Sequence, residues 1–301
     1  MSVLITGITG FVGQNLKEFL ILNHDDEIQS LDLRRISDPV LSPEVSTVIH
    51  LAGKAHDLKK TAVEDEYFDV NYGLTKKLFE AFLLSNATQF IFMSSVKAAA
   101  DQLDEDLTEL YTPDPLTAYG KSKLKAELFI MDQHLPPGKF AYILRPCMIH
   151  GPGNKGNLNL LYKIVKKGLP YPLAAFKNRR SFLSVKNLCF ILNEIIKRKD
   201  LPSGIYNISD DEPLATTEVV RLLARATNTK KVRLWKIPAQ WVRNLAKAGD
   251  RFHFPLNTER LTKLTESYVV SNAKIKSWLN KELPLNSSEG IRETADSFNK
   301  L

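Results

Sequence analysis

A glycine-rich turn near the start of the chain restricts the fold more than any other feature. Residues 6–13 (TGITGFVG) follow the apolar run 3–5 and lead into an amphipathic stretch at 11–22. Glycines in such a turn permit a tight bend, let backbone N–H groups approach a pyrophosphate and let helix and strand pack closely. This order predicts a dinucleotide-binding unit, with cofactor contacts from Gly7, Gly10, Phe11, Val12 and Gly13.

The first half of the chain alternates short apolar runs with helical patterns. Continuous runs of Val, Ile and Phe are typical of strands buried on both faces of a parallel sheet. We therefore expect an α/β protein with a doubly wound parallel sheet of the Rossmann type. The expected strands are residues 3–5, 28–31, 47–51, 90–93 and 140–144, and the expected helices are 11–22, 67–84 and 119–134.

The sequence changes in character after Arg145-Pro146, where a loop rich in glycine and proline begins. We expect residues 1–150 to form the dinucleotide-binding domain and residues 151–301 to form a smaller, mixed substrate-binding lobe. Within the second part, a helix at 185–199 and a strand at 204–208 are expected to return to the first sheet.

An acidic residue marks the end of the second expected strand. Asp32 lies nineteen residues beyond Gly13, where a carboxylate accepts hydrogen bonds from both hydroxyls of the adenine ribose and repels a 2′-phosphate. This favours NAD over NADP. Arg34 and Arg35 follow directly and could hold such a phosphate, so NADP stays open. The alternative is an ordinary glycine turn followed by a solvated aspartate.

Tyr119 and Lys123 are four residues apart in an expected helix, which places them on one helical face. A tyrosine has an ordinary pKa of about 10, and an ammonium about 4 Å away contributes on the order of 4 kcal/mol, enough to make the phenol a useful base. Ser95 follows the strand 90–93, and ligands bind at the carboxyl ends of parallel strands. Ser95, Tyr119 and Lys123 are therefore predicted to be a catalytic set. The alternatives are a solvated lysine and a serine that caps a turn.

These segments together resemble the extended short-chain dehydrogenase/reductase family, which contains NAD-dependent nucleotide-sugar epimerases and dehydratases. The matching segments are TGITGFVG (6–13), VIHLAG (48–53), the helix start at 71–73, FMSS (92–95), YGKSK (119–123) and LRP (144–146). The resemblance implies that Ser95 and Tyr119 bind the oxygen at sugar C4, with Tyr119 as the acid and base. It also implies cofactor contacts from Leu51, Ala52, Gly53, Asn71 and Lys123.

The resemblance extends to a pocket for UDP. Segments 153–157 (GNKGN), 178–185 (NRRSFLSV) and 267–272 (SYVVSN) match the family. Asn157 is expected to meet the diphosphate or the uridine, and Arg180 to pair with a phosphate. The alternative for Arg180 and its neighbour Arg179 is a solvated pair on the surface.

The chain departs from the dehydratase branch of this family. That branch carries an Asp-Glu pair directly after its active-site hydroxyl residue, whereas this chain has Val96-Lys97, so dehydratase activity is not expected. The SSVK form with the NRRS segment resembles a subgroup of UDP-sugar 4-epimerases and UDP-4-keto-sugar reductases of bacterial surface-polysaccharide pathways. Lys97 either contacts the substrate or stiffens its loop, and we favour the second interpretation.

Composition argues against several other classes. The net charge is +7, but the basic residues form short, scattered clusters without interleaved aromatics, so no nucleic-acid partner is expected. No apolar run approaches the roughly 18 residues of a membrane span, so no integral membrane association is expected. Cys147 and Cys189 lie in no paired spacing, which indicates reduced thiols in a cytoplasmic protein. His50 and His56 lack a third ligand at metal spacing, and His50 is interpreted as a core histidine, so no metal is expected.

One helical pattern in the second half has no place in this chemistry. An apolar row and a basic row run along the same stretch. Such a stretch can lie on a membrane surface, but we expect its apolar row to pack on its own lobe. The apolar row is Trp241, Leu245, Ala248 and Phe252, and the basic row is Arg243, Lys247 and Arg251.

The sequence therefore predicts a UDP-sugar 4-epimerase that holds NAD and acts through a transient 4-keto sugar. The alternative within the family is an NAD(P)H-dependent reductase of UDP-4-keto-6-deoxy sugars. A non-catalytic dinucleotide sensor is a third hypothesis, although this chain keeps the tyrosine and the lysine that such relatives usually lose. By analogy with the family that the chain resembles, we expect a homodimer that forms through the helices 67–84 and 119–134.

Overall fold

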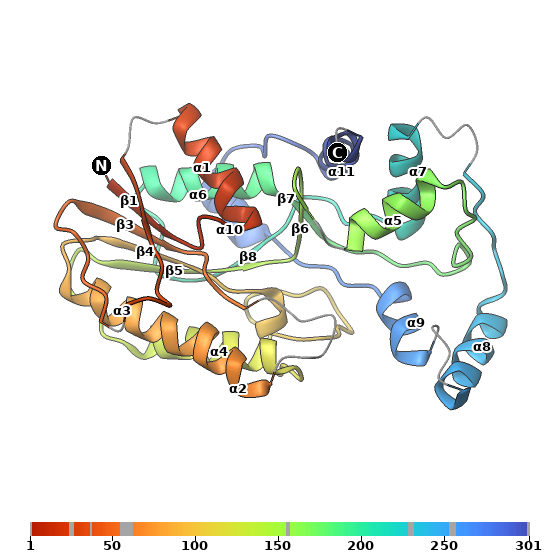
Figure 1. Ribbon diagram of the computed structural model, residues 1–301, viewed down its shortest axis with the longest axis horizontal. Coiled ribbons are helices and arrows are strands. Elements are labelled where there is room, and N and C mark those ends of the chain that lie inside the picture. Colours follow the sequence, from red (N-terminus) through yellow and green to blue (C-terminus); the bar gives the residue numbers. More distant parts are fainter. Residues whose placement is uncertain are drawn as a thin grey trace.

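The computed structural model describes residues 2–23, 27–36, 38–54, 63–154, 157–227, 232–252 and 257–299, without the side chains of residues 157, 252, 259 and 263. A parallel sheet of six strands, in the order β2-β1-β3-β4-β5-β8, forms the centre of the described part (Figure 1). The strands are β1 (Ser2–Thr6), β2 (Glu27–Leu31), β3 (Val45–His50), β4 (Gln89–Met93), β5 (Phe140–Pro146) and β8 (Gly204–Ile208).

The strand order confirms the predicted doubly wound sheet. β2 pairs with one edge of β1 and β3 pairs with the other, so the direction in which the chain builds the sheet reverses between β1 and β3. Ligands of such sheets bind at this reversal, in the crevice outside the carboxyl ends of the strands. The five strands predicted in the first half are all present, with ends that differ by one or two residues.

Helices cover both faces of the sheet (Figure 1). Because each face is covered, the inner strands β1, β3, β4 and β5 are buried on both sides, which explains their apolar runs. The edge strand β2 is exposed or half-buried along its length. Leu20 shares one apolar core with Leu188, while Phe79 belongs to a second core on the opposite face. One face carries α1 (Phe11–Asn23) and α6 (Val185–Lys197), and the other carries α3 (Leu74–Leu84) and α4 (Ala118–Asp132).

The helix predicted at 67–84 is interrupted. It begins earlier, as α2 (Glu64–Phe68), and passes through one π-helical turn, η1 (Asp69–Gly73), before α3 starts. A π-turn holds one residue more than an α-turn and is defined by its backbone hydrogen bonds, which the hydrophobic pattern does not record. Such turns often occur at functional sites.

The C-terminal lobe has its own apolar core and a small second sheet. β6 (Met148–His150) pairs in parallel with β7 (Phe182–Ser184), and neither strand was predicted. Since β8 pairs with β5, the chain returns to the large sheet after this lobe begins; the domain boundaries stay a prediction. The lobe contains α5 (Asn157–Lys166), α7 (Thr216–Ala226), α8 (Ala239–Phe252), α9 (Thr258–Thr265) and α11 (Ser287–Phe298), whereas α10 (Ala273–Leu279) contacts β8.

The prediction for the apolar row of α8 is wrong. Val242 and Ala246 face the lobe core, whereas Trp241 is 74% exposed and Leu245 is 56% exposed. The helix carries two apolar rows, and the row of smaller side chains is the one that fits against the lobe. No helix among the described residues is long and apolar enough to cross a membrane.

Candidate active site

The glycine turn presses against the carboxyl end of β3. Gly7 has φ = 71°, and a Cβ on it would lie 2.7 Å from the backbone nitrogen of Ala52. A Cβ on Gly13 would lie 2.4 Å from the carbonyl oxygen of Gly7. Both positions therefore exclude any side chain, and Leu51 and Ala52 lie directly beside the turn. Phe11 and Val12 form the first turn of α1, where backbone N–H groups lack helical partners.

A buried chain of hydrogen bonds leads from this turn to the π-turn. The Ala52 N–H donates to Thr6 Oγ1 (3.2 Å), Thr6 Oγ1 lies 2.7 Å from His50 Nδ1, and His50 Nε2 lies 2.9 Å from Thr75 Oγ1. Thr75 Oγ1 in turn donates to the Asn71 carbonyl (2.7 Å). Because the Thr75 proton is used there, His50 must carry its proton on Nε2 and accept from Thr6 on Nδ1.

His50 is thus a core histidine held in one tautomer. Its ring is fully buried, and burial, followed by the charge of Lys123, lowers the pKa of His50 to about 3. The ring is neutral at physiological pH for that reason. The described residues hold no group of side chains suited to a metal ion, and His56 lies outside the described residues.

Asn71 lies in the π-turn and hydrogen-bonds both the loop after β3 and the helix α4. Its Oδ1 accepts from the Lys54 N–H (2.8 Å), and its Nδ2 donates to the Lys54 carbonyl (3.1 Å) and to Ser122 Oγ (3.0 Å). Ser122 Oγ then donates to the carbonyl of Tyr119 (2.8 Å). The sequence argument missed Ser122, which lies between the tyrosine and the lysine of the motif and links the loop after β3 to α4.

Lys123 is buried between the carboxyl ends of β3 and β4. Its ammonium donates to the Met93 carbonyl (2.8 Å) and lies 4.8 Å from the centre of the Phe92 ring. A Cβ on Gly53 would lie 3.1 Å from Lys123 Nζ. Burial lowers the pKa of Lys123 to about 8, and the carboxylate of Glu127 partly opposes this effect. The interpretation of Lys123 as a solvated lysine is therefore wrong.

Ser95 and Tyr119 meet at the tip of β4. Ser95 caps the short helix η2 (Val96–Ala98) by accepting from the Lys97 N–H (3.2 Å), and its side chain also hydrogen-bonds Tyr119. The ring of Tyr119 is half-buried and lies 6.4 Å from the ring of Tyr67. Ser95 therefore does cap a helix, as the alternative interpretation held, and it also contacts the phenol.

The expected acidity of the phenol is not observed. Burial raises the pKa of Tyr119, and the hydrogen bond from Ser95 lowers it only in part. The ammonium of Lys123 donates to the Met93 carbonyl, and the groups that shift the pKa of Tyr119 are its buried surroundings, Ser95 and Tyr67. Spacing on a helix predicted the shared face correctly, but the direction of the lysine side chain depends on the sheet.

A buried ion pair joins α4 to β5. Arg145 Nε donates to Glu127 Oε1 (3.0 Å), and Arg145 Nη2 donates to Glu127 Oε2 (2.5 Å), with both residues 1% exposed or less. Ser94 Oγ also donates to Glu127. Glu127 stands one helical turn after Lys123, a spacing that could have indicated it. The pair joins α4, β5 and the tip of β4.

Asp32 follows β2, and its carboxylate pairs with the neighbouring side chains of Arg34 and Arg35. Its carboxylate accepts from the backbone N–H of Arg34 (3.2 Å) and from Arg34 Nε (3.1 Å), and Arg35 Nε lies 3.5 Å away. These contacts hold the pKa of Asp32 below its usual value. The features that favour NAD and NADP thus form one exposed cluster beside the end of β1.

The residues expected at the UDP pocket lie in the lobe. Asn157 is the first residue of α5, and its side chain is not among those that the structure describes. The backbone of Arg180 bridges Leu214 and Tyr268, and the Tyr268 hydroxyl donates to the Ala100 carbonyl (2.7 Å), just after the loop that holds Ser95. Lys97 lies 4.2 Å over the Tyr268 ring, which agrees with a role in stiffening this loop.

A doubly wound sheet with a glycine turn at its reversal point is the architecture of dinucleotide-binding enzymes. The chain belongs to the NAD dependent epimerase/dehydratase family, whose model matches residues 3–209, and it is therefore an NAD(P)-dependent enzyme. This confirms the family that the sequence motifs predicted.

The chain is 29% identical to the UDP-glucose 4-epimerase of Vibrio cholerae, over 99% of this chain and 95% of the relative. It is 27% identical to the N-acetyl-alpha-D-glucosaminyl-diphospho-ditrans,octacis-undecaprenol 4-epimerase of Escherichia coli O157:H7, over 91% and 84%. It is also 28% identical to a 3 beta-hydroxysteroid dehydrogenase/Delta 5-->4-isomerase of Mycobacterium tuberculosis, over 86% and 80%.

Solved structures share the whole fold. A UDP-glucuronic acid 4-epimerase from Bacillus cereus in complex with NAD superimposes with a TM-score of 0.76 and 18% identity, covering 100% of this chain and 97% of that one. RMD from Pseudomonas aeruginosa complexed with NADPH gives 0.74 and 19%, covering 100% and 99%. At these identities the likeness concerns the fold.

Proposed function

We propose that this chain is an NAD-dependent UDP-sugar 4-epimerase that acts through a transient 4-keto sugar. The observation that carries the proposal is the phenol of Tyr119, hydrogen-bonded to Ser95 at the tip of β4 and one helical turn before the buried ammonium of Lys123. Similarity to a UDP-glucose 4-epimerase over nearly the whole chain supports it.

The described residues fit a dinucleotide. The turn at Gly7 and Gly13 leaves backbone without side chains at the first turn of α1, which suits a pyrophosphate. Asp32 stands at the end of the neighbouring strand, where the adenine ribose would lie. Bound NAD supplies a hydride acceptor and a positive charge. We infer that Lys123, which has three donors and gives one to Met93, holds the nicotinamide ribose with the others.

Ser95 and Tyr119 present two hydroxyl groups to the substrate. In the proposed reaction Tyr119 removes the proton of the C4 hydroxyl and later returns it, while Ser95 holds the same oxygen. Because burial raises the pKa of Tyr119 in the free protein, the phenol keeps its proton until a positive charge enters the site and favours the phenolate. Asn157 and Arg180 are proposed to bind the UDP moiety.

The test is interconversion of UDP-glucose with UDP-galactose, and of the corresponding N-acetylated pair, by the purified protein. Tyr119→Phe is expected to lower kcat by about 10²- to 10⁴-fold, since it removes the acid and base. Tyr72→Phe is the matched control, because its ring contacts with Phe129 and Lys125 do not need the hydroxyl. Net consumption of added NADH without interconversion of any UDP-sugar would contradict the proposal.

A second candidate is an NAD(P)H-dependent reductase of UDP-4-keto-6-deoxy sugars. It is favoured by Arg34 and Arg35, which lie against Asp32 where a 2′-phosphate would approach, and by the fold shared with a structure that holds NADPH. The discriminating measurement is whether NAD remains bound through purification. Asp32→Asn is expected to shift coenzyme preference toward NADPH, because it removes the carboxylate and releases the arginines.

We further propose that the enzyme is a cytoplasmic homodimer in surface-polysaccharide sugar-nucleotide biosynthesis. The face of α3 and α4 exposes Leu84 (91%), Leu128 (57%) and Met131 (56%), apolar side chains that a second copy could cover. Light scattering during size-exclusion chromatography should show a dimer that Leu128→Glu dissociates. A wild-type protein that is monomeric at all concentrations would contradict the dimer.

A further inference from the structure

The helix α4, which runs along one face of the sheet (Figure 1), contacts the tip of β4 at two successive residues. Lys123 donates to the Met93 carbonyl (2.8 Å), and one helical turn later the Glu127 carboxylate accepts from the Ser94 hydroxyl. Ser95 is the next residue of the chain. Because both contacts directly precede Ser95, they determine where its side chain lies relative to the helix.

The Glu127 carboxylate is itself fixed by Arg145. Arg145 Nε donates to Oε1 (3.0 Å) and Nη2 donates to Oε2 (2.5 Å), so both carboxylate oxygens have a charged partner. The Ser94 N–H donates to the carbonyl of Leu144 (2.8 Å), which precedes Arg145 in β5. Ser94, Glu127 and Arg145 are all buried. The tip of β4, the end of β5 and the helix α4 are therefore joined in one buried ring of contacts.

Stability alone does not account for charged groups at this place. Removing two charges from water costs free energy, and two apolar residues of similar volume often give equal or greater stability. A carboxylate differs from such residues because it accepts several hydrogen bonds, and a fully satisfied buried network holds its members in one geometry. The geometry at stake here is that of Ser95, since its side chain hydrogen-bonds the phenol of Tyr119.

We propose that the Glu127–Arg145 pair positions Ser95 for the reaction. The pair acts through Ser94, and it keeps the hydroxyl groups of Ser95 and Tyr119 at the separation at which both reach the C4 oxygen of the sugar. The inference rests on the proposed function, in which these two hydroxyl groups share that oxygen. A misplacement of about 1 Å can lower a rate by about 10²-fold, so loss of the pair should lower kcat.

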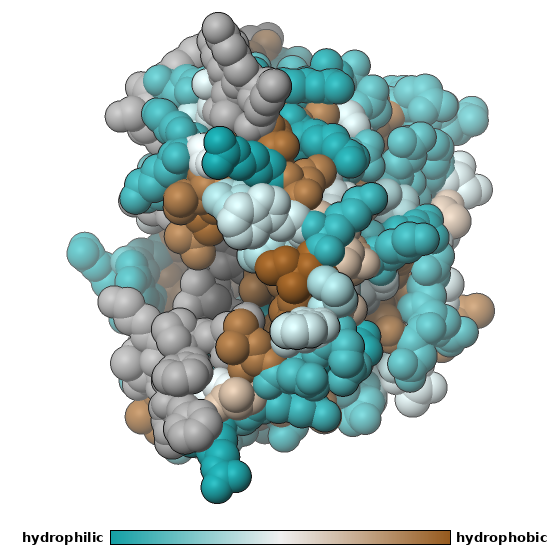
Figure 2. Space-filling model, turned by 90° about the vertical axis from the view of Figure 1, so that its right-hand side faces the viewer, coloured by the Kyte–Doolittle hydropathy of each residue, from teal (hydrophilic) through white to brown (hydrophobic). Residues whose placement is uncertain are grey.

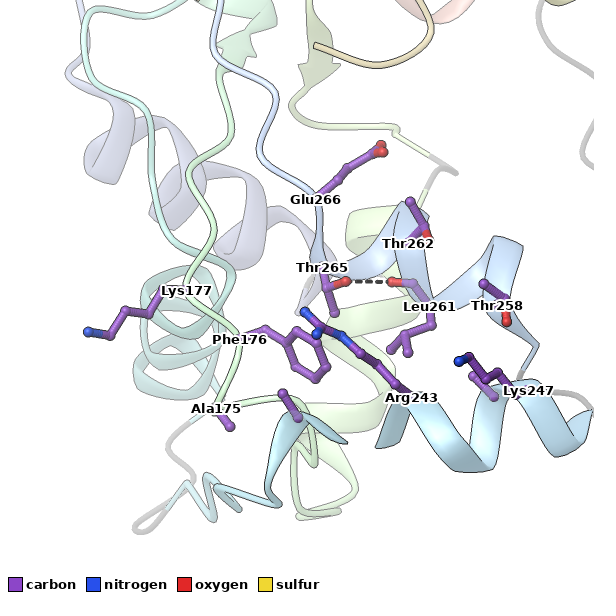
Figure 3. A pocket seen from close by; sticks show the side chains of 12 residues that line it. Ala175, Phe176, Lys177, Arg243, Lys247, Thr258, Leu261, Thr262, Thr265 and Glu266 are labelled. Carbon is purple, nitrogen blue, oxygen red and sulfur yellow. Dashed lines mark hydrogen bonds between the residues drawn. The ribbon is translucent and has the colours of Figure 1, made fainter. Parts of the chain in front are cut away.

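Binding of the UDP moiety should not depend on the pair. Asn157 and Arg180, the residues proposed for it, belong to the lobe, whose outer end faces the viewer in Figure 2. The pocket of about 640 Å³ in Figure 3 also lies in the lobe, between α8, α9 and residues 175–177, and none of the described residues that line it comes from α4, β4 or β5. The KM of the UDP-sugar should therefore stay unchanged while kcat falls.

The test compares two variants with the wild type. Glu127→Leu with Arg145→Leu removes both charges together, so the protein should unfold at nearly the wild-type urea concentration. Its kcat for interconversion of UDP-sugars should nevertheless fall about 10- to 10²-fold at unchanged KM. Ser94→Ala keeps the ion pair and removes only the hydroxyl, and its kcat should fall about tenfold. If the double variant does not fold, Ser94→Ala decides.

Thr47→Val is the matched control. The Thr47 hydroxyl is also buried and donates to Gln89 Oε1 (2.9 Å), but Gln89 begins β4, at the end of the strand opposite to Ser95. This variant should keep the wild-type kcat. An equal fall of kcat in Thr47→Val and Ser94→Ala would overturn the proposal, because any buried hydrogen bond of β4 would then have the same effect.

A measurement without turnover separates this inference from the proposed function. In NMR spectra of the free protein with labelled tyrosine, the ring carbon that bears the Tyr119 hydroxyl is assigned by its absence in Tyr119→Phe. Its resonance should move in Ser94→Ala and stay in place in Thr47→Val. A wild-type protein that interconverts no UDP-sugar would contradict the proposed function alone, and this resonance then decides. An unmoved resonance, or a wild-type kcat in Ser94→Ala, would overturn the positioning role.

Discussion

The tip of the sheet and the outer surface of α8 differ in which side chains they bury and which they expose. At the sheet, Asn71, Lys123 and Glu127 are nearly or fully buried, and each of them has named hydrogen-bond partners. On α8, Trp241 and Leu245 are exposed, although they are the largest apolar groups of the helix that the structure describes. The first arrangement positions reacting groups, because buried polar groups keep one geometry. The second leaves apolar area available for a partner.

The largest effect is expected when one partner of the buried Arg145–Glu127 ion pair is removed. Arg145→Leu leaves the Glu127 carboxylate buried without its cation, and the free energy of unfolding should fall by about 3–5 kcal/mol in urea denaturation. Replacing both residues by leucine should restore most of the loss, since no uncompensated charge remains. If the free energy of unfolding of the single variant falls by less than about 1 kcal/mol, the pair contributes no more than an exposed ion pair does, and the prediction is wrong.

The neutral His50 makes a pH-dependent prediction. Burial lowers the pKa of His50 to about 3, whereas an unfolded histidine has a pKa of about 6.5. Between these values the unfolded chain binds a proton that the folded chain does not, so the stability present above pH 6.5 is lost as the pH falls. His50→Gln should lose about 3 kcal/mol less than the wild type between pH 6.5 and 4.

The matched control for this experiment is His134→Gln, since His134 is exposed just after α4. It should lose stability with falling pH as the wild type does. If His50→Gln and the wild type show parallel profiles in denaturation at each pH, then His50 is not held neutral by its buried surroundings.

A smaller effect is expected at the glycine turn. A Cβ on Gly13 would lie 2.4 Å from the Gly7 carbonyl and 2.6 Å from the Ile8 Cα, both backbone atoms that cannot rotate away. Gly13→Ala should cost about 1–3 kcal/mol of stability and weaken NAD binding, measured by calorimetry. Gly73→Ala is the control, because its nearest neighbour would lie 3.8 Å away; equal NAD affinity in both variants would contradict the close approach.

The smallest effect is expected on the lobe surface. Trp241→Ser with Leu245→Ser should change the free energy of unfolding by less than about 0.5 kcal/mol, as exposed substitutions usually do. Leu261→Ala, at a buried position of α9, should cost about 2 kcal/mol or more. If thermal denaturation shows a large loss for the double variant, the apolar row packs on the lobe after all.

Several parts of the site could be predicted from the sequence because they follow local rules. A glycine turn between a strand and a helix, a spacing of four residues on one helix and a serine directly after a strand all depend on neighbours in the chain. Gly53, Asn71 and Lys123 do come together, although they are far apart in sequence. The pKa of Tyr119 in the free protein was predicted in the wrong direction, because burial of the phenol raises it and burial depends on the tertiary structure.

Local patterns were enough to determine the class of fold, the strands and most helices, the position of the dinucleotide turn and the family. Only the tertiary structure decided the single tautomer of His50, the π-turn at Asn71, the pairing of Glu127 with Arg145 and the outward face of Trp241. The physical reason is that periodicity records which side chains are apolar, whereas burial, hydrogen-bond partners and pKa depend on segments that meet only after folding.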